Sequence, residues 1–181
     1  GEVADRCATA TKDALATVAP QVMLTDGIAG AYHAGQTRFL ARNAVKPVLV
    51  RDSAGRTALP NLFETTGEQF IADHALGEEV FGPLGLVVRV GSSDEAEQLA
   101  RNLEGQLTAT IHLDDGDLET ARGLVQVLER KAGRVLVNGF PTGVEVVDSM
   151  VHGGPYPAST NFGATSVGTL SIRRFLRPVS Y

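Results

Sequence analysis

The residues of this sequence that are best suited to chemistry form one short run, EEVFGP at residues 78–83, directly ahead of a predicted strand. Two acids, an aromatic residue and a Gly-Pro pair would present a carboxylate and a ring from one rigid turn. A carboxylate accepts hydrogen bonds from both hydroxyls of a ribose, and a ring packs on a sugar or on a nicotinamide face. The alternative is a solvated acid pair beside a core phenylalanine, since charged residues are mostly exposed and phenylalanines mostly buried.

Other side chains are weaker candidates. His152 stands beside two glycines and would contact a substrate, the alternative being a turn histidine without a role. The four histidines show neither the spacing nor the partnering cysteines of a metal site, so we expect no metal. Cys7 falls on the apolar side of a predicted helix, where a packing residue is expected because free cysteines are usually buried. Three arginines near the C-terminus would attract a dianionic substrate or form a solvated basic end.

Helices and strands must hold these residues in place. In the first half, apolar residues recur at helical spacing until Pro20, which ends the first helix. Asp26 is the expected cap of the second helix. The helices and strands predicted in this half cover residues 3–18, 27–42, 47–51, 61–65 and 68–73.

The pattern is clearer from residue 84 onward. Strands are predicted at residues 84–90, 107–113 and 134–138, the first a continuous apolar run typical of a strand covered on both faces. Ser92 and Glu95 form a capping box for one intervening helix. Asp117 is the expected cap of the other, and Gly133 its expected end. Alternating strands and helices predict an α/β fold. Its mostly parallel sheet should have helices on both faces and include the strands near residues 47, 84, 107 and 134.

After Gly139 the chain becomes rich in Gly, Pro, Ser and Thr and is too long for an ordinary connection. Such a segment is either functional or lies on a partner surface. The last residues alternate weakly and predict an edge strand. We therefore expect a domain portion at residues 1–150 and, at residues 151–181, an irregular tail that serves in oligomerisation.

Composition excludes several classes of protein. The 181 residues carry a formal net charge of -5, which gives no electrostatic reason to expect nucleic-acid binding. The sequence contains neither an apolar run long enough for a membrane span nor a signal-peptide pattern at its start. A single cysteine cannot form an internal disulfide and fits a reducing cytoplasm.

The EEVFGP run, followed in order by LGLVVRV, DEAEQLARN, TATIHLDD and RVLVNG, resembles the E-x-F-G-P motif of the aldehyde dehydrogenase superfamily and the elements downstream of it. The tail segments HGGPYPAS, TSVG and RRFLRPV are similar to one branch of that superfamily. This branch contains 2-oxoglutarate semialdehyde (2,5-dioxopentanoate) dehydrogenases and NADP-dependent fatty aldehyde dehydrogenases. The resemblance covers nearly the whole chain and corresponds to the C-terminal part of the enzymes.

The resemblance implies roles for individual residues. The second acid of the motif binds the ribose beside the nicotinamide, and the phenylalanine contacts that ribose and ring; these roles fall on Glu79 and Phe81. Asn138, in a V-N turn, would help to shape the substrate side, although Asn-Gly is also a common turn pair. The implied cofactor is NAD or NADP, and the implied substrate is an aldehyde, with 2-oxoglutarate semialdehyde favoured. The full-length enzyme is expected to be a cytoplasmic homo-oligomer.

The family chemistry requires a cysteine thiolate and a glutamate base. Cys7 lies in ADRCATATKD and not in the G-Q-x-C type of loop that holds the family nucleophile. We therefore assign no catalytic residue to this chain and expect the 181 residues alone to be inactive, with the nucleophile and the dinucleotide-binding units upstream. The alternative from another class is a non-catalytic interaction module that binds dehydrogenase subunits.

Overall fold

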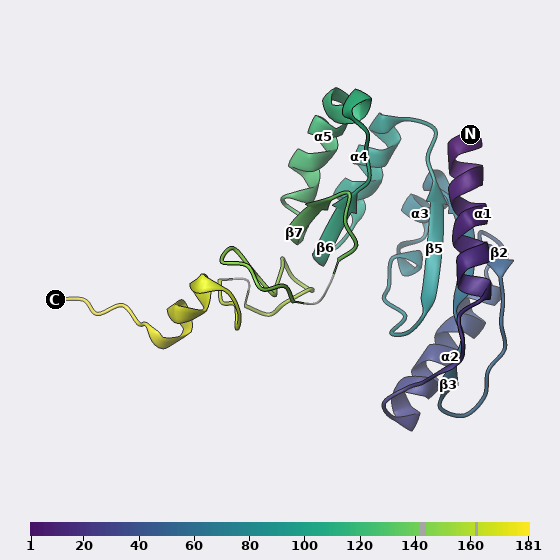
Figure 1. The fold of residues 1–181 in the computed structure, drawn as a ribbon, viewed down its shortest axis with the longest axis horizontal. Helices are drawn as coiled ribbons and strands as arrows, with labels where there is room; N and C mark the ends of the chain where they lie inside the picture. Colours follow the sequence, from purple (N-terminus) through teal and green to yellow (C-terminus); the bar gives the residue numbers. More distant parts are fainter. Residues whose placement is uncertain (142–143, 162) are drawn as a thin grey trace. The chain divides into compact units, whose positions relative to one another are not determined.

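The computed structural model describes residues 1–141, 144–161 and 163–181 of the chain (Figure 1). Contacts divide it into two units, Gly1–Gly91 and Ser92–Tyr181, each of which is described by itself. Both units combine helices and strands, and from β5 onward strands and helices alternate as the sequence predicted. None of the helices in the described part of the chain combines the length and apolar character needed to cross a membrane.

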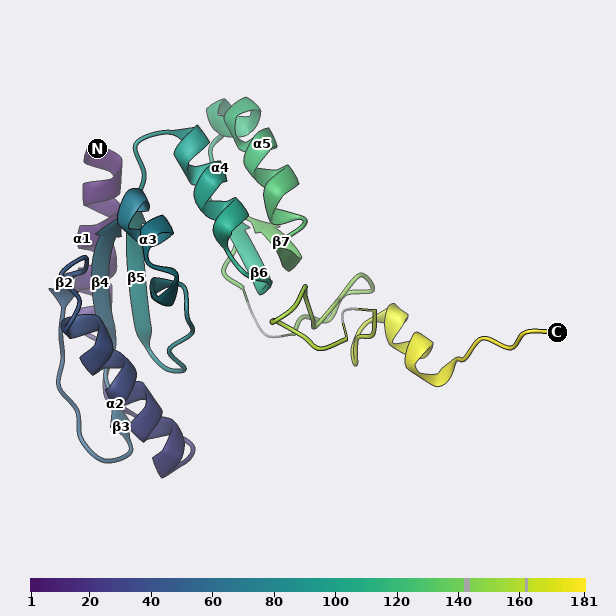
Figure 2. The same ribbon diagram turned by 180° about the vertical axis from the view of Figure 1, so that it is seen from behind.

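The first unit is built on a three-stranded sheet in the order β2 (Lys46–Leu49), β4 (Asn61–Thr66), β5 (Leu84–Arg89). β4 and β5 are parallel, with Asn61 opposite Leu84. Helix α1 (Glu2–Ala16) lies on one face of this sheet, and α2 (Asp26–Leu40) and α3 (Gly67–Ala72) lie on the other (Figure 2). A short antiparallel pair, β1 (Gln21–Val22) and β3 (Thr57–Ala58), and a 3-10 turn, η1 (His74–Leu76), complete the unit.

Apolar packing and a few ionic contacts hold the helices to this sheet. Phe39 of α2 and Phe63 of β4 lie in one buried cluster, with their ring centroids 5.3 Å apart. On the other face, the Arg51 guanidinium donates hydrogen bonds to two carbonyls at the end of α1. Arg89 contacts Glu64 of β4 and Asp5 of α1, both at 2.7 Å, so α1 is tied to two strands.

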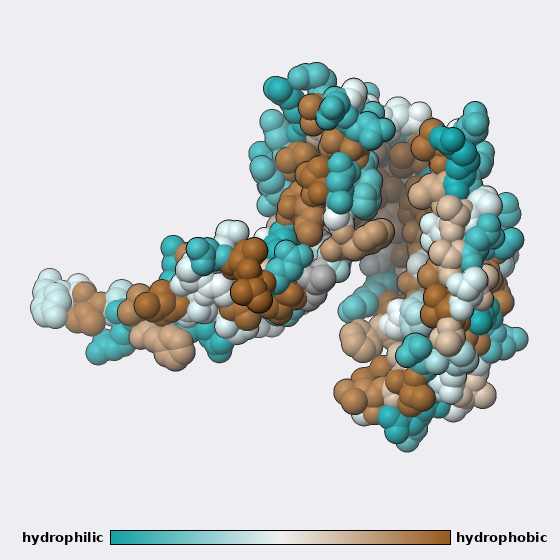
Figure 3. Space-filling view, in the orientation of Figure 1, coloured by the Kyte–Doolittle hydropathy of each residue, from teal (hydrophilic) through white to brown (hydrophobic). Residues whose placement is uncertain are grey.

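The second unit has the parallel strands β6 (Gln106–Ile111) and β7 (Ala132–Val137). Helices α4 (Ser93–Asn102) and α5 (Leu118–Leu128) pack side by side on one face of this pair, around buried Ala100, Ile111 and Val127. Between β6 and α5 lies the 3-10 turn η2 (Asp115–Asp117). Apolar side chains gather over β6 and β7 and along the segment that follows them (Figure 3).

Two predictions about the sheet are corrected. β2 runs antiparallel to β4 and not parallel to it. The connecting residues 50–60 contain no helix, and a parallel pair needs a longer crossover, usually helical. The four predicted strands were also expected in one sheet, whereas hydrogen bonding groups β6 and β7 in a sheet of their own.

Helix boundaries were predicted with mixed success. Ser92 caps α4 as predicted, because its hydroxyl accepts a hydrogen bond from the Glu95 amide. The cap of α2 is Thr25 and not Asp26, which becomes the first helical residue, where a negative charge favours the positive end of the helix dipole. Asp117 is the N-cap residue of α5 as predicted, but its side chain makes no cap bond to that helix. Gly133 does not end that helix but belongs to β7.

The last segment of the chain differs from the expected edge strand. Residues Thr169–Phe175 form a 3-10 helix, η3, because their backbone groups bond within the segment, as from the Ser171 amide to the Gly168 carbonyl. A strand instead needs the backbone groups of a neighbour. The expected role of residues 151–181 in oligomerisation stays a prediction.

Candidate functional site

The EEVFGP turn, residues 78–83, connects η1 to the amino end of β5. Ligands in open α/β sheets usually lie at the carboxyl ends of strands, so the position of the turn alone does not indicate a site. Its side chains are more informative. Glu79 is exposed, and Phe81 is 63% exposed, so Phe81 is not the core phenylalanine of the alternative interpretation. Glu78 lies 3.6 Å from the Arg38 guanidinium.

The turn is held at two of its residues, Val80 and Gly82. Val80 packs against the buried cluster of the first unit, where Gly35 of α2 gives it room. Gly82 has φ +149°, a conformation that L side chains rarely adopt, and any Cβ there would run into the ring of Tyr32. Phe81 stands between these two packed residues, and Glu79 directly precedes the first of them.

A buried polar network lies beneath the turn. The Tyr32 hydroxyl donates to the Leu59 carbonyl at 2.6 Å and lies 3.4 Å from the Pro83 carbonyl. The Asn61 amide group donates to the Tyr32 hydroxyl at 2.8 Å, and the Asn61 backbone N–H donates to the Pro83 carbonyl at 2.9 Å. Burial raises the pKa of Tyr32 above its ordinary value of 10.0, and the hydrogen bond from Asn61 acts in the opposite direction. The hydroxyl is therefore a neutral structural group at physiological pH.

Asn138 stands where β7 ends. It has φ 52°, in the left-handed region that asparagine tolerates better than most residues. Its side-chain carbonyl accepts from the Leu113 amide, and its side-chain amide donates to the Leu113 carbonyl, both at 2.9 Å. These bonds fasten the end of β7 to the end of β6. The two bonds give the Asn138 side chain a structural role, and its role on the substrate side stays a prediction.

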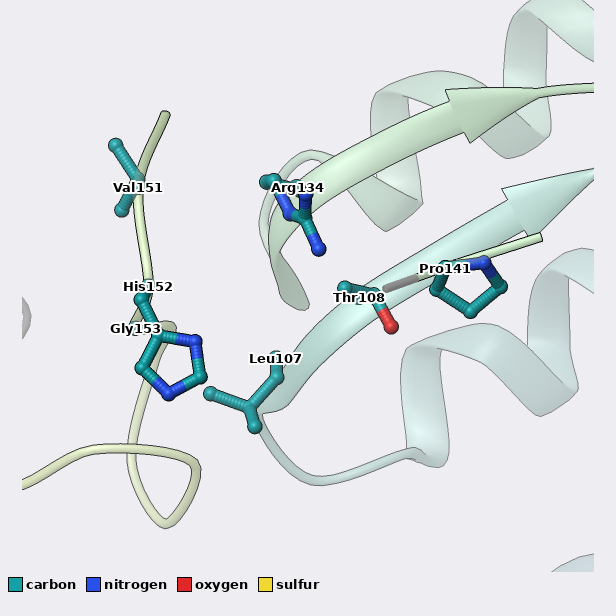
Figure 4. A pocket seen from close by; sticks show the side chains of 7 residues that line it. All are labelled: Leu107, Thr108, Arg134, Pro141, Val151, His152 and Gly153. Carbon is teal, nitrogen blue, oxygen red and sulfur yellow. The ribbon is translucent and has the colours of Figure 1, made fainter. Parts of the chain in front are cut away.

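His152 lines a cavity of about 160 Å3 in the second unit. In Figure 4 its imidazole points towards Leu107, and Arg134 and Thr108 project from the two neighbouring strands. The Arg134 guanidinium lies 3.4 Å from the Met150 sulfur, and the His152 backbone N–H donates to the Thr165 hydroxyl at 3.1 Å. The residues around the cavity are Leu107, Thr108, Arg134, Pro141, Val151, His152 and Gly153.

Residues 150–159, which hold this part of the tail, lie against the strands of their own unit. A Cβ on Gly133 of β7 would collide with the Gly153 carbonyl, and one on Gly154 would collide with the Gln106 carbonyl. The Gly105 amide donates to the Tyr156 carbonyl at 3.3 Å. The glycines therefore let two backbones approach closely, which composition alone did not reveal.

Two expectations concern the remaining reactive side chains. Cys7 was expected to be buried, but it is exposed, and Ala8 beside it is the buried residue of α1. Helical spacing places both near the apolar stripe, and a shift of one position decides which faces the sheet. Across residues 1–141, 144–161 and 163–181, His, Cys, Asp and Glu side chains form no group of three able to hold a metal ion.

Known proteins were compared with the chain in sequence and in structure. No protein-family model matches it. Alpha-ketoglutaric semialdehyde dehydrogenase 2 of Azospirillum brasilense is 48% identical over 179 residues. Alpha-ketoglutaric semialdehyde dehydrogenase of Acinetobacter baylyi is 45% identical over 182 residues. Each match covers 98% of this chain and 34% of the relative, so the chain spans about a third of the length of these relatives.

The fold also matches a solved structure. A double mutant of betaine aldehyde dehydrogenase from Staphylococcus aureus, in complex with NAD+, aligns with a TM-score of 0.72 over 97% of this chain and 36% of that protein. The sequence identity is 16%, so this match bears on the fold alone.

Proposed function

Because the chain is related along nearly its whole length to the C-terminal part of aldehyde dehydrogenases, we propose that it is that part of an NAD(P)-dependent aldehyde dehydrogenase. The whole enzyme would oxidise an aldehyde to a carboxylate, with alpha-ketoglutaric semialdehyde as the favoured substrate. That substrate is the one named for both curated relatives, at 48% and 45% identity. The nucleophile would come from the rest of the enzyme, because Cys7 lies on α1, outside any G-Q-x-C loop.

The observation that carries the cofactor role is the exposure of Glu79 and Phe81 on one held turn. The Glu79 carboxylate would accept hydrogen bonds from the two ribose hydroxyls beside the nicotinamide, and the Phe81 ring would pack on that ribose and ring. The exposed carboxylate and the exposed ring are separated by one residue, which fits a ligand that offers hydroxyls next to a flat face. The bound cofactor would supply the hydride acceptor, and these two residues would orient it.

Further parts of the proposal concern the rest of the chain. Residues 1–150 would belong to the catalytic domain and residues 151–181 would serve in assembly of a cytoplasmic homo-oligomer. Several exposed apolar residues support the second role, among them Ile172 and Phe175 of η3, at 61% and 86% exposure. Asn138 and His152 would face the substrate side.

A pair of variants in the full-length enzyme tests the cofactor role. Glu79→Gln keeps the shape of the side chain but removes the charge that strengthens the bonds to ribose. Losing charge-assisted hydrogen bonds should raise KM for NAD(P)+ by about 10-fold or more. Glu78→Gln is the matched control, since that carboxylate faces Arg38 and should leave KM unchanged. Equal KM values for both variants and the wild type would refute the role of Glu79.

The substrate proposal needs a separate assay. NAD(P)H formation would be followed with alpha-ketoglutaric semialdehyde and with an uncharged aldehyde of similar length. We expect a clearly higher kcat/KM for the former. A preference for the uncharged aldehyde would overturn the substrate assignment and leave the family relation intact.

A further inference from the structure

We infer that Tyr32 and Asn61 are positioning residues for the cofactor turn: they act on NAD(P)+ binding through residues 78–83, without touching the cofactor. This inference rests on the proposed function of Glu79 and Phe81. Both side chains are buried, at 0% exposure. The Tyr32 ring of α2 lies against Gly82 of the turn, whereas Asn61 of β4 bonds to the Tyr32 hydroxyl through its side chain and to the Pro83 carbonyl through its backbone N–H.

Asn61 is the centre of the network. Its side-chain carbonyl accepts from the Arg51 amide at 2.9 Å and from the Gln36 side chain at 3.2 Å. Its side-chain amide donates to the Leu59 carbonyl at 3.0 Å, besides the bond to the Tyr32 hydroxyl. Nearly all the hydrogen-bonding capacity of this side chain is thus used, which fixes its orientation. A buried amide of this kind is costly unless satisfied, so the network has one favoured arrangement.

Tyr32 links this network to the turn through two contacts. Its ring lies where a side chain at position 82 would stand, so the backbone of Gly82 rests against the ring. Its hydroxyl lies 3.4 Å from the Pro83 carbonyl, which also accepts from the Asn61 backbone at 2.9 Å. The carboxyl side of the turn is therefore held by the ring and by two polar contacts.

The amino side of the turn is held by a different contact, the packing of Val80 against Gly35 on the same helix as Tyr32. Phe81 lies between the two anchored positions, so its ring direction depends on both. Losing the contacts at Gly82 and Pro83 would leave the turn held to α2 by the packing of Val80 and the exposed Glu78–Arg38 ion pair. A shift of about 1 Å in a positioning contact can lower activity by up to ~100-fold.

The test uses the full-length enzyme. Tyr32→Phe removes the hydroxyl but keeps the ring, and we expect KM for NAD(P)+ to rise about 10-fold. KM for the aldehyde should stay unchanged. Amide hydrogen exchange in residues 78–83 should become faster, a change that does not depend on cofactor chemistry. Gln36→Met removes one hydrogen-bond donor to Asn61, so it should also raise KM for NAD(P)+ and speed amide exchange in the turn, by smaller amounts. If Tyr32→Phe fails to fold, the result for Gln36→Met tests the positioning role.

Thr65→Val is the matched control, because Thr65 is a buried residue of β4 whose hydroxyl donates to the Ala44 carbonyl at 2.7 Å, away from the turn. It should leave both KM values and the exchange of residues 78–83 unchanged. If Glu79→Gln raises KM for NAD(P)+ and Tyr32→Phe and Gln36→Met do not, the positioning role is overturned and the proposed function stands. If Glu79→Gln also leaves KM unchanged, the proposed function of the turn fails, and the positioning role fails with it.

Discussion

The contact between Gly133 of β7 and the Gly153 carbonyl gives a sharp test of how residues 150–159 are held. A Cβ introduced by Gly133→Ala would meet backbone atoms of residues 153 and 154, far inside the ordinary van der Waals separation of 3.4–4 Å. Backbone atoms cannot be relieved by rotation of a side chain. The 150–159 segment must therefore move away from the strands.

The magnitude follows from three contributions. Overpacking of this kind costs about 1–3 kcal/mol. Moving the segment also weakens the bond from the Gly105 amide to the Tyr156 carbonyl, which contributes about 1 kcal/mol. Replacing a strand glycine by alanine returns about 0.5–1 kcal/mol through reduced chain entropy. We expect a net destabilisation of about 1–3 kcal/mol.

Urea unfolding of the 181-residue chain, followed by circular dichroism, measures this difference, since the chain contains no tryptophan to report by fluorescence. Hydrogen exchange of residues 150–159 should also become faster. Gly116→Ala is the control in the same unit, because a Cβ there meets nothing within 4 Å, and its stability should hardly change. Equal unfolding curves for the two variants would show that the segment is not held against its own strands.

Three further predictions test other contacts. Gly35→Ala should destabilise the first unit by about 1 kcal/mol, because its Cβ would meet a Val80 methyl at 2.5 Å. In a Val80→Ala background the same change should instead stabilise the unit. Urea unfolding of the wild type, the two single variants and the double variant checks this change of sign in the effect of Gly35→Ala. Asn138→Ala should lower the free energy of unfolding by about 2–3 kcal/mol, measured as a lower melting temperature, since two bonds to Leu113 and a residue that tolerates the left-handed conformation are lost together. Asn138→Gly should lose less, and equal losses would refute the backbone argument. Because burial raises the folded-state pKa of Tyr32, the contribution of this group to stability is complete below about pH 10 and is lost as the pH rises above it. The free energy of unfolding, measured from about pH 9 to 11, should therefore fall less steeply for Tyr32→Phe than for wild type, and parallel curves would contradict this.

Local signals in the sequence predicted the elements well. The helix ahead of Pro20, the Ser92 cap of α4 and the alternation of β5, α4, β6, α5 and β7 all follow from periodicity and capping chemistry. These features depend on neighbours within a few residues, so a single sequence contains them. The strand direction of β2 is different, because apolar periodicity is the same for parallel and antiparallel pairing.

Long-range contacts account for most of what the sequence did not predict. Gly133 was taken for the end of a helix, but its partner is the carbonyl of Gly153, twenty positions along the chain, which no local rule can find. Tyr32 falls in the helix predicted at residues 27–42, but the helical pattern does not indicate the partners of its hydroxyl, which lie 27 and 51 positions along the chain. In the candidate site, too, the sequence and the structure indicated different residues. Family resemblance indicated Glu79 and Phe81, while the residues that hold them came from the fold.

The span between Tyr32 and Pro83 also has a consequence for synthesis on the ribosome. These two residues are 51 positions apart, and residues 78–83 lead directly into β5, which pairs in parallel with β4. Contacts of such separation form late, since the entropy of closing the intervening chain must be overcome first. Helix α2 and its Tyr32 will therefore have left the exit tunnel well before the turn exists. During that interval the Tyr32 ring lacks its contact with Gly82, and the Asn61 backbone N–H lacks the Pro83 carbonyl. A chaperone that binds there would act before residues 78–83 reach their final conformation.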